Sequence, residues 1–524
     1  MIYALEVDAA VDAVGTVQTF LFSTLGFTTL PTDTPANTVA RERLRQPASF
    51  QREMARGRAM FGALSGSYGS ATLDNADGEL DSFARHGFGW RRCVVRACDA
   101  DYGNVPAYPA GWTTVLSAAV KFVQVDRASV VLMLRDRIDL LDKPLCTTYS
   151  GAGGADGTTQ MTGAPKPRVY GSVCNIPATL VEPSDGIYQV SDQPFTQPRW
   201  AYDQRVAYTP YSANYNDAAT FADLQALSIG STAARYSDGG FVKIGGTPAG
   251  VVTVDAVRMS AGYPVTFGRS RFGEVLADIC TDAGLVIGVD VDAAAVAIDT
   301  AGGDSQGLYF SDTTSTYRDA LSTLAVSRGA YVGFNRLGVL CAGVVESPSG
   351  TAAWVFGPHN CIGLARVDGP FLVPVKSVRV RGGKNWRPML PAEIDASVSA
   401  SDRALLALGS VYSDTDTGAA ASKFLDAAEY QQDTTSGQVS AAAPALPGNS
   451  VGVAAAALLD LFGVERDTVE VTVAMSLALV DAVDLGAVVQ VRWPRFGYDA
   501  GKLFLVIGVR YDLAGNRMVF TLWG

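Results

Sequence analysis

Residues 73–81, LDNADGELD, combine carboxylates, an amide and a glycine in a pattern that could bind Ca²⁺. A calcium loop needs oxygen ligands at positions one, three and five, a glycine at six and a glutamate at twelve. With Gly78 at position six, positions three and five are filled, but Leu73 falls at position one and Ala84 at position twelve. Two essential ligands are missing, so we assign no metal-binding residue here.

The same stretch fits a tight turn better. Asn75 and Asp77 have short side chains that can bond to nearby backbone groups, and Gly78 can adopt the positive φ that such turns require. We therefore predict a turn between strands. The direction in which its acidic cluster faces stays open.

Nucleophilic catalysis has few candidate residues in this chain. Its only two histidines are His86 and His359, and Cys361 follows the second of them at a spacing of two. A Cys–His pair needs the two side chains within hydrogen-bond reach, and neighbours two apart reach each other only in a special turn. The motifs HExxH and the Walker loop are absent. We assign no catalytic residue and expect that the chain is not an enzyme.

Cofactor and metal motifs are also missing from the sequence. GAGGADG at 151–157 departs from GxGxxG and follows no clear strand that leads into a helix, so we assign no cofactor-binding residue and expect no cofactor. Asp and Glu are spread through predicted turns, and the sequence cannot show whether two of them form the pair that sugar hydrolysis needs. The closest cysteines are spaced Cys-x4-Cys, without the second pair of a zinc or iron–sulfur site. All seven are interpreted as free buried thiols: Cys93, Cys98, Cys146, Cys174, Cys280, Cys341 and Cys361.

The elements that must position these residues are mostly strands. Short alternating runs of Val, Thr, Tyr and Phe lie between turns rich in Gly and Pro, which predicts a mainly β chain with α+β parts. We expect four regions: an N-terminal β domain at 1–145, a loop-rich connector or insert at 146–215, a small α/β domain at 216–355 and a C-terminal β domain at 356–524. The C-terminal β domain is expected to contain a flexible insertion at about 396–450.

Helices are predicted where apolar residues recur at helical spacing. RFGEVLADICTDAG (271–284) and STYRDALSTLAVSRGA (315–330) each place an apolar stripe before a glycine that can end a helix. VGVAAAALLDLFGV (451–464) predicts a strongly apolar helix, and ASKFLDAAEY (421–430) predicts a possible one. DLAGN (512–516) predicts a hairpin between the last two strands.

Composition limits the classes of partner. The net charge is −11 and the isoelectric point about 4.8, which argues against ordinary binding to nucleic acids or anionic membranes. Apolar residues make up 48% of the chain and charged residues only 18%, as in a folded protein with extensive internal or subunit contacts. We find no signal peptide and no apolar run of about 18 residues. We expect assembly in a cytoplasm and no membrane span.

Several segments, taken in order, resemble the baseplate or tail-tip hub proteins of tailed bacteriophages. TPANT (34–38) is followed by RLRQPASFQRE (43–53) and then by LDNADGELD. The resemblance continues in APKPRVYGSVCNIPATLVEPSDGIYQVSD, YSDGGFVKIGGTPAGVVTVD and RFGEVLADICTDAGL, and ends in LGAVVQVRWPRFGYDAGKLFLVIGVRYD and FTLWG. These segments span nearly the whole chain, except for about 396–450.

The resemblance implies a structural virion protein with two tail-tube-like β-barrel or sandwich domains, one at each end of the chain, flanking the α/β region. Three chains would close a homotrimeric ring, whose six tube-like domains adapt a sixfold tail tube to a threefold tip. The implied partners are a distal tail protein or tail tube above and tip, fibre or spike proteins below. Genomic DNA would pass transiently without specific binding, and the location would be the virion tail.

Other functions stay open at this stage. The chain could be another tail-tip component, such as a distal tail ring or a receptor-binding protein. A tail-associated cell-wall hydrolase would need a carboxylate pair or a metal site in a cleft. A sugar-binding module is suggested only by the seven Trp and 20 Tyr residues, which also suit β cores and interfaces.

Overall fold

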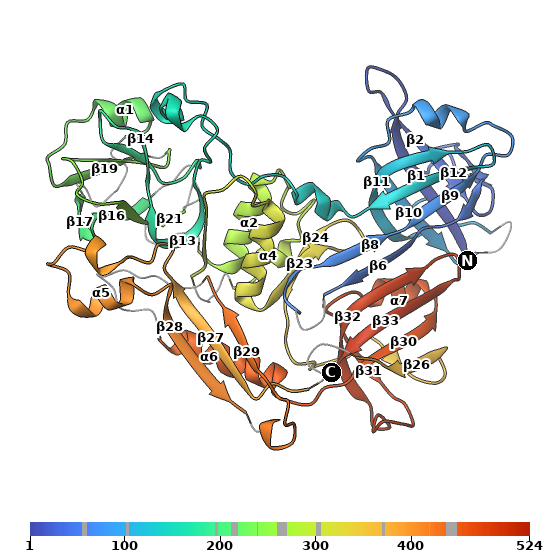
Figure 1. The fold of residues 1–524 in the computed structure, drawn as a ribbon. Coiled ribbons are helices and arrows are strands. Elements are labelled where there is room, and N and C mark those ends of the chain that lie inside the picture. The colour runs from blue at the N-terminus through green and yellow to red at the C-terminus, as the bar shows by residue number, and fades with distance from the viewer. Residues whose placement is uncertain are drawn as a thin grey trace. The chain divides into compact units, whose positions relative to one another are not determined.

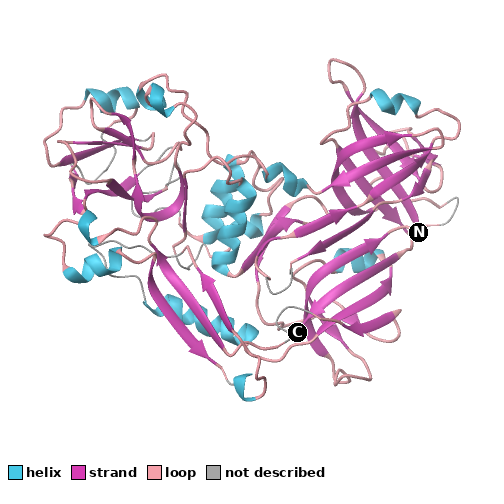
Figure 2. Ribbon diagram, in the orientation of Figure 1, coloured by secondary structure: helices cyan, strands magenta, loops and turns pink. Residues whose placement is uncertain are grey.

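The computed structural model describes residues 1–54, 60–100, 104–193, 197–210, 218–237, 239–258, 270–299, 305–368, 373–418, 420–435 and 448–524. The fold of these residues is mainly β with α+β parts, as predicted, and Figure 2 shows the strands and the fewer helices. No sheet that these residues form closes into a barrel. Within the same residues, no helix is both long enough and apolar enough to cross a membrane.

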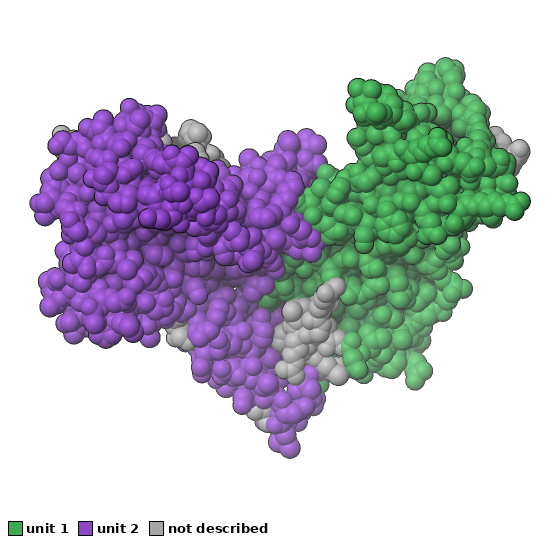
Figure 3. Space-filling model, turned by 45° about the horizontal axis from the view of Figure 1, so that its top comes forward, with its two compact units in different colours: residues 1–140, 331–372, 465–524 green, residues 141–330, 373–464 purple. Residues whose placement is uncertain are grey.

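The chain forms two compact units that are interleaved in sequence. Unit 1 contains residues 1–140, 331–372 and 465–524, and unit 2 contains residues 141–330 and 373–464; Figure 3 colours them separately. The chain therefore passes from one unit to the other four times. The four-region division stays a prediction, and we describe each unit by itself.

Unit 1 contains a nine-stranded sheet built from the N-terminal part of the chain (Figure 1). Its strand order is β3-β4-β2-β1-β10-β11-β12-β9-β5. Strand β12 shows why these segments form strands, because every second residue (Val130, Leu132, Leu134) is buried. The bounds are β1 Ile2–Ala10, β2 Val17–Ser23, β3 Phe27–Thr28, β4 Val39–Glu42, β5 Leu44–Gln46, β9 Ser70–Asp74, β10 Arg92–Cys98, β11 Thr113–Val125 and β12 Ser129–Arg135.

A second sheet of unit 1 is built from the C-terminal part of the chain. Its order is β25-β31-β32-β33-β30-β26, and β6 joins it by pairing with β32 and with β8. The predicted DLAGN hairpin is confirmed, because β32 and β33 pair antiparallel on either side of it. The bounds are β6 Ser49–Glu53, β8 Ser65–Tyr68, β25 Val355–Phe356, β26 Gly363–Arg366, β30 Thr468–Ala474, β31 Val488–Val491, β32 Lys502–Asp512, β33 Arg517–Trp523 and the helix α7 Leu477–Ala482.

A small sheet of order β24-β23-β7 completes unit 1. Its strands are β7 Gly62–Ala63, β23 Ala330–Phe334 and β24 Leu340–Val344. Gly338 has a φ of +74° in the turn between β23 and β24, as expected of a tight hairpin. Gly333 lies within β23, where a Cβ atom would come within 2.7 Å of Leu64.

Unit 2 contains three sheets and most of the helices. The strand orders are β17-β16-β21-β13-β22, β14-β15-β20-β19-β18 and β28-β27-β29. The strands are β13 Arg168–Pro177, β14 Thr179–Glu182, β15 Ile187–Gln189, β16 Gln197–Asp203, β17 Val206–Ala207, β18 Thr209–Pro210, β19 Ala233–Ser237, β20 Phe241–Ile244, β21 Val252–Val257, β22 Gly307–Phe310, β27 Ser377–Lys384, β28 Ser410–Thr417 and β29 Glu429–Asp433. The helices are α1 Phe221–Ala226, α2 Phe272–Asp282, α3 Ala293–Val296, α4 Tyr317–Arg328, α5 Ala400–Leu406 and α6 Gly448–Phe462.

The two amphipathic helices form as predicted. The apolar stripe of α2 is buried, and so is that of α4. Helix α4 begins with a capping box between Thr316 and Asp319 and ends at Gly329, whose φ of 69° lets its N–H donate to the Ala325 and Val326 carbonyls. The apolar helix predicted at 451–464 is also confirmed as α6.

The predicted helix over ASKFLDAAEY is wrong. Its last two residues instead begin β29, which pairs in parallel with β27 from Ser377↔Glu429 to Arg381↔Asp433. The pairing decides the outcome here, because a strand edge that needs a partner outweighs a weak local helix preference. Much of 396–450 is therefore regular structure, with α5, β28 and β29, and residues 419 and 436–447 lie outside the described part.

Candidate functional site

The stretch 73–81 forms the predicted turn. Asn75 is fully buried, and its Oδ1 accepts a hydrogen bond from the Leu80 N–H at 2.8 Å. The Asp77 carboxylate accepts from the Glu79 N–H at 3.1 Å, and Gly78 has a φ of +73°. These are the side-chain-to-backbone bonds and the positive φ that the sequence predicted.

The carboxylates of the turn are held by arginines. Arg41, Arg43 and Arg45 are spaced two apart and pair with Glu79, Asp77 and Asp74 respectively, and Arg43 also pairs with Glu79. The Arg43 guanidinium donates to both oxygens of Asp77, at 2.9 and 2.6 Å, and lowers the pKa of that carboxyl group. We call these six residues the arginine–carboxylate cluster. The sequence signal for it was the alternation RERLR, which places three arginines on one face of an extended segment.

The arrangement of these side chains is that of an ion-pair cluster. Within the residues that the structure describes, no group of three or more His, Cys, Asp or Glu side chains is placed to hold a metal ion. The carboxylates at 74–79 that a cation would use are bonded to guanidinium and backbone N–H groups instead.

The two histidines lie in different surroundings. His86 stacks on Phe20, with ring centroids 5.8 Å apart, and lies 5.5 Å from the Phe83 ring. Beside His359, the Cys361 thiol donates to the Asn360 side-chain oxygen at 3.3 Å. Burial raises the pKa of Cys361 to about 11, so this sulfur is a neutral thiol at pH 7 and a poor nucleophile.

The glycine-rich stretch 151–157 closes on itself. The Gly153 N–H donates to the Gly157 carbonyl at 2.8 Å, and the Gly151 N–H donates to the Asp156 carbonyl at 3.1 Å. The Asp156 carboxylate pairs with Lys166 at 2.5 Å. A phosphate-binding loop needs free N–H groups directed at the ligand. Here the N–H groups of Gly151 and Gly153 are bonded to carbonyls of the same loop, and the loop carries the Asp156 carboxylate.

The candidate functional site is a junction between the sheets of unit 1. Strand β6 comes from the N-terminal region but pairs antiparallel with β32, from Ser49↔Asp512 to Glu53↔Gly508. Phe50 on β6 stacks between two tyrosines, with its ring centroid 4.4 Å from that of Tyr511 and 6.0 Å from that of Tyr68. We call β6, its partners and the contacts below the sheet junction.

A buried ion pair lies at the sheet junction. The Arg52 side chain is 1% exposed and pairs with Asp484, whose side chain is 32% exposed. Burial works against the charged guanidinium, but the nearby Asp484 carboxylate raises the pKa of Arg52. Burial also raises the pKa of Tyr68 and Tyr511 above their ordinary values, so both hydroxyls are neutral.

Further side chains tie the two large sheets of unit 1 together. The Tyr3 hydroxyl on β1 donates to Asn516 Oδ1 at 2.8 Å in the last hairpin, and burial raises the pKa of Tyr3 to about 12. Arg336 pairs with Asp481 on α7 at 2.8 Å and donates to the Thr114 carbonyl on β11. Sequence reasoning missed these contacts, because no local pattern marks a pairing between positions hundreds of residues apart.

Solved structures that are similar to this chain include tail proteins and a chain of a virion particle. The 43 kDa tail protein of prophage MuSo2 from Shewanella oneidensis is 10% identical, with 100% of this chain and 98% of that chain covered and a TM-score of 0.37. The tail protein from Neisseria meningitidis MC58 is 9% identical, with coverages of 100% and 96% and a TM-score of 0.42.

A chain from the virion of a native gene transfer agent particle is 12% identical, with 69% of this chain and 84% of that chain covered and a TM-score of 0.42. No protein-family model and no curated protein sequence matches this chain. The identities and TM-scores of these structures give no residue of this chain a role.

Proposed function

We propose that the chain is a structural protein of a phage tail and forms the trimeric hub of a tail tip or baseplate. The observation that carries this proposal is the sheet junction. The β regions from the two ends of the chain belong to one compact unit, and β6 from the first region completes the sheet of the second. A single subunit thereby offers two joined β modules.

Two modules per chain suit a change of symmetry. Three chains provide six modules, which match the subunits of a sixfold tail tube, while the ring as a whole keeps threefold symmetry for the tip below. Contacts between unlike surfaces of neighbouring chains close such a ring. They would also cover the apolar surface of a chain that is 48% apolar and 18% charged.

The negative charge suits a conduit for DNA. Three chains carry a formal charge of −33, which is three times −11. Carboxylates that face a channel would repel phosphates, so that DNA passes transiently and is not bound, whereas cationic walls would retain it in a salt-dependent way. A channel lined mainly by Lys and Arg in the assembled tail would contradict this part of the proposal.

The remaining partners follow from the hub role. A distal tail protein or the tail tube would bind on one side of the ring, and tip, fibre or spike proteins on the other. The protein would be assembled in the host cytoplasm and reside in the virion tail. The role requires no cofactor and no catalytic residue.

A reconstruction of the particle at low resolution tests the proposal. We expect a threefold ring of this chain that closes the tail tube, and a trimer by mass measurement of the isolated assembly. A hexameric ring would assign the chain to the distal tail proteins instead. Clearing of peptidoglycan by the purified chain would assign it to the cell-wall hydrolases.

A further inference from the structure

The loop between β31 and β32, residues 492–501, presents an aromatic ring from a strained backbone position. Phe496 has a φ of 64° and is followed by Gly497 with a φ of 77°. Bulky side chains rarely adopt this left-handed conformation, and such strain is concentrated at functional sites. The Phe496 residue is nevertheless 45% exposed, so the strain does not serve to bury the ring.

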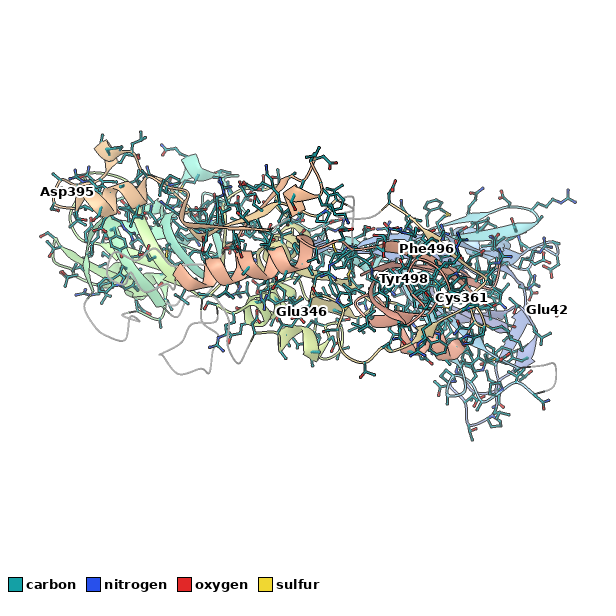
Figure 4. The ribbon with its side chains drawn as sticks, turned by 90° about the horizontal axis from the view of Figure 1, so that it is seen from below. Glu42, Glu346, Cys361, Asp395, Phe496 and Tyr498 are labelled. Atoms are coloured by element: carbon teal, nitrogen blue, oxygen red, sulfur yellow. The ribbon has the colours of Figure 1, made fainter. Side chains whose placement is uncertain are left out.

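Tyr498, two residues after Phe496, anchors the loop to the sheet. Tyr498 is 1% exposed and packs edge-on against Phe504 of β32, with ring centroids 5.5 Å apart. Its N–H donates to the Arg495 carbonyl at 3.2 Å, and its carbonyl accepts from the Trp493 N–H at 3.2 Å. Figure 4 shows the Phe496 and Tyr498 side chains. The anchor holds Phe496 in place in the free protein, which lowers the entropy cost of binding a partner.

Two guanidinium groups lie near the exposed Phe496 ring. The Arg495 guanidinium carbon lies 5.3 Å from the centroid of the Phe496 ring, and that of Arg366 lies 5.9 Å away. Arg492 donates to Gln490 Oε1 at 3.1 Å. In the described part of the chain, no carboxylate pairs with Arg492 or Arg495, whereas Arg366 shares Asp467 with Lys502.

This loop is basic in an acidic chain. The loop residues 492–501, RWPRFGYDAG, contain two arginines and one carboxylate and therefore carry +1, which leaves −12 for the rest of the chain of net charge −11. Phenylalanine, tryptophan and arginine are the types enriched in protein interfaces, and a positive patch is complementary to a negative one. The occupant that suits this surface is an acidic protein surface, and every copy of this chain is acidic overall.

We propose that this cationic loop, residues 492–498 with Arg366, binds an acidic surface on a second copy of the chain. The inference rests on the proposed ring, in which the loop of one subunit meets an unlike surface of the next. In that contact, the arginines of the loop supply the electrostatic attraction and Phe496 supplies the central apolar side chain.

Charge reversal in the full chain tests the electrostatic part. The variant Arg492→Glu/Arg495→Glu should need at least about tenfold more protein for half-assembly by mass photometry or analytical ultracentrifugation. A matched control, Arg85→Glu/Arg127→Glu, changes the charge equally at two exposed arginines of unit 1 that lie outside the loop and the sheet junction, and it should assemble like the unmodified chain. Raising NaCl from about 50 to 500 mM should weaken assembly of the unmodified chain and affect the loop variant much less.

The substitution Phe496→Gly separates binding from stability. Glycine adopts the left-handed conformation without strain, so the melting temperature should stay equal or rise, while assembly should weaken about tenfold because the ring is lost. A lower melting temperature with unchanged assembly would show that the ring serves only the fold of the loop, and would overturn the proposal.

The outcomes distinguish this contact from the ring itself. An unmodified trimer together with unchanged assembly of the charge-reversed variant overturns the contact and leaves the hub proposal standing. An unmodified chain that stays monomeric overturns both. If the charge-reversed variant assembles normally but no longer shifts double-stranded DNA that the unmodified chain shifts, the loop binds DNA and the proposal is wrong.

Discussion

The buried ion pair of the sheet junction makes an asymmetric prediction. The Arg52 side chain is 1% exposed, whereas the Asp484 side chain is 32% exposed. Removing one partner of a fully buried pair costs about 3–5 kcal/mol, because the other charge is left without compensation. Asp484→Asn keeps the shape and the oxygen acceptor but removes the charge next to a buried guanidinium. Since water already reaches Asp484, we lower the expected cost to about 2–3 kcal/mol.

The converse substitution should cost less. Arg52→Met keeps an apolar stem in the core and leaves the Asp484 carboxylate, which water can hydrate, so we expect about 1 kcal/mol. The double variant should then be less damaged than the sum of the two singles, with a coupling energy of about 1–2 kcal/mol. The variant that loses more stability therefore shows which of the two charges, that of Arg52 or that of Asp484, the fold has to compensate.

Hydrogen exchange measures this locally, without requiring the whole chain to unfold in two states. Peptides that cover β6 and β32 should exchange about 30- to 150-fold faster in Asp484→Asn and about fivefold faster in Arg52→Met, since 1.4 kcal/mol is a factor of ten. Peptides from β13 in unit 2 serve as the internal control and should not change. Equal acceleration by the two variants, or a coupling energy near zero, would refute the reasoning.

Three further predictions follow from other contacts. Asn75→Ala removes the acceptor of the Leu80 N–H and two donor contacts from a fully buried site, so we expect a loss of about 2–4 kcal/mol in unfolding free energy, measured against Asp77→Ala, whose side chain is largely exposed. The Asp312 carboxylate accepts hydrogen bonds from Thr314 and Ser315, and these bonds outweigh its partial burial and lower its pKa to about 2. The variant Asp312→Asn should therefore lose stability above pH 4, and the difference in melting temperature should vanish as the pH falls from 4 to 2. A difference that does not depend on pH would contradict this. With a pKa of about 11, the Cys361 thiol should react with iodoacetamide at pH 7.5 far more slowly than free cysteine, which peptide mass mapping can follow.

Local features of this fold could be predicted from the sequence. The apolar stripes of α2 and α4, the glycine that ends α4 and the last hairpin each depend on residues a few positions apart. The turn at 73–81 was predictable for the same reason, since Asn75 and Gly78 act on their own backbone neighbours. The periodicity and turn chemistry of such segments decide their structure before distant contacts form.

Features that depend on distant pairing could not be predicted in this way. The helix expected over 421–430 fails because β29 completes a sheet with β27, some fifty residues earlier in the chain. The pairing of β6 with β32 joins residue 52 to residue 509, and nothing in RLRQPASFQRE marks its arginine as a buried partner of Asp484. A one-dimensional pattern shows which face of a strand is buried, but it does not show against which strand.

The arginine–carboxylate cluster changes where the channel charge of the proposed hub must come from. The sequence left open the direction in which the acidic cluster of 73–81 faces, and three of its carboxylates are paired with Arg41, Arg43 and Arg45. Three cations beside three anions produce almost no field beyond a Debye length of about 8 Å. In the proposed hub, repulsion of DNA would therefore come from carboxylates outside this cluster, such as the exposed Glu42. A reconstruction in which the 73–81 turn lined the channel would leave the DNA path nearly neutral there, and the electrostatic part of the hub proposal would then depend on other segments.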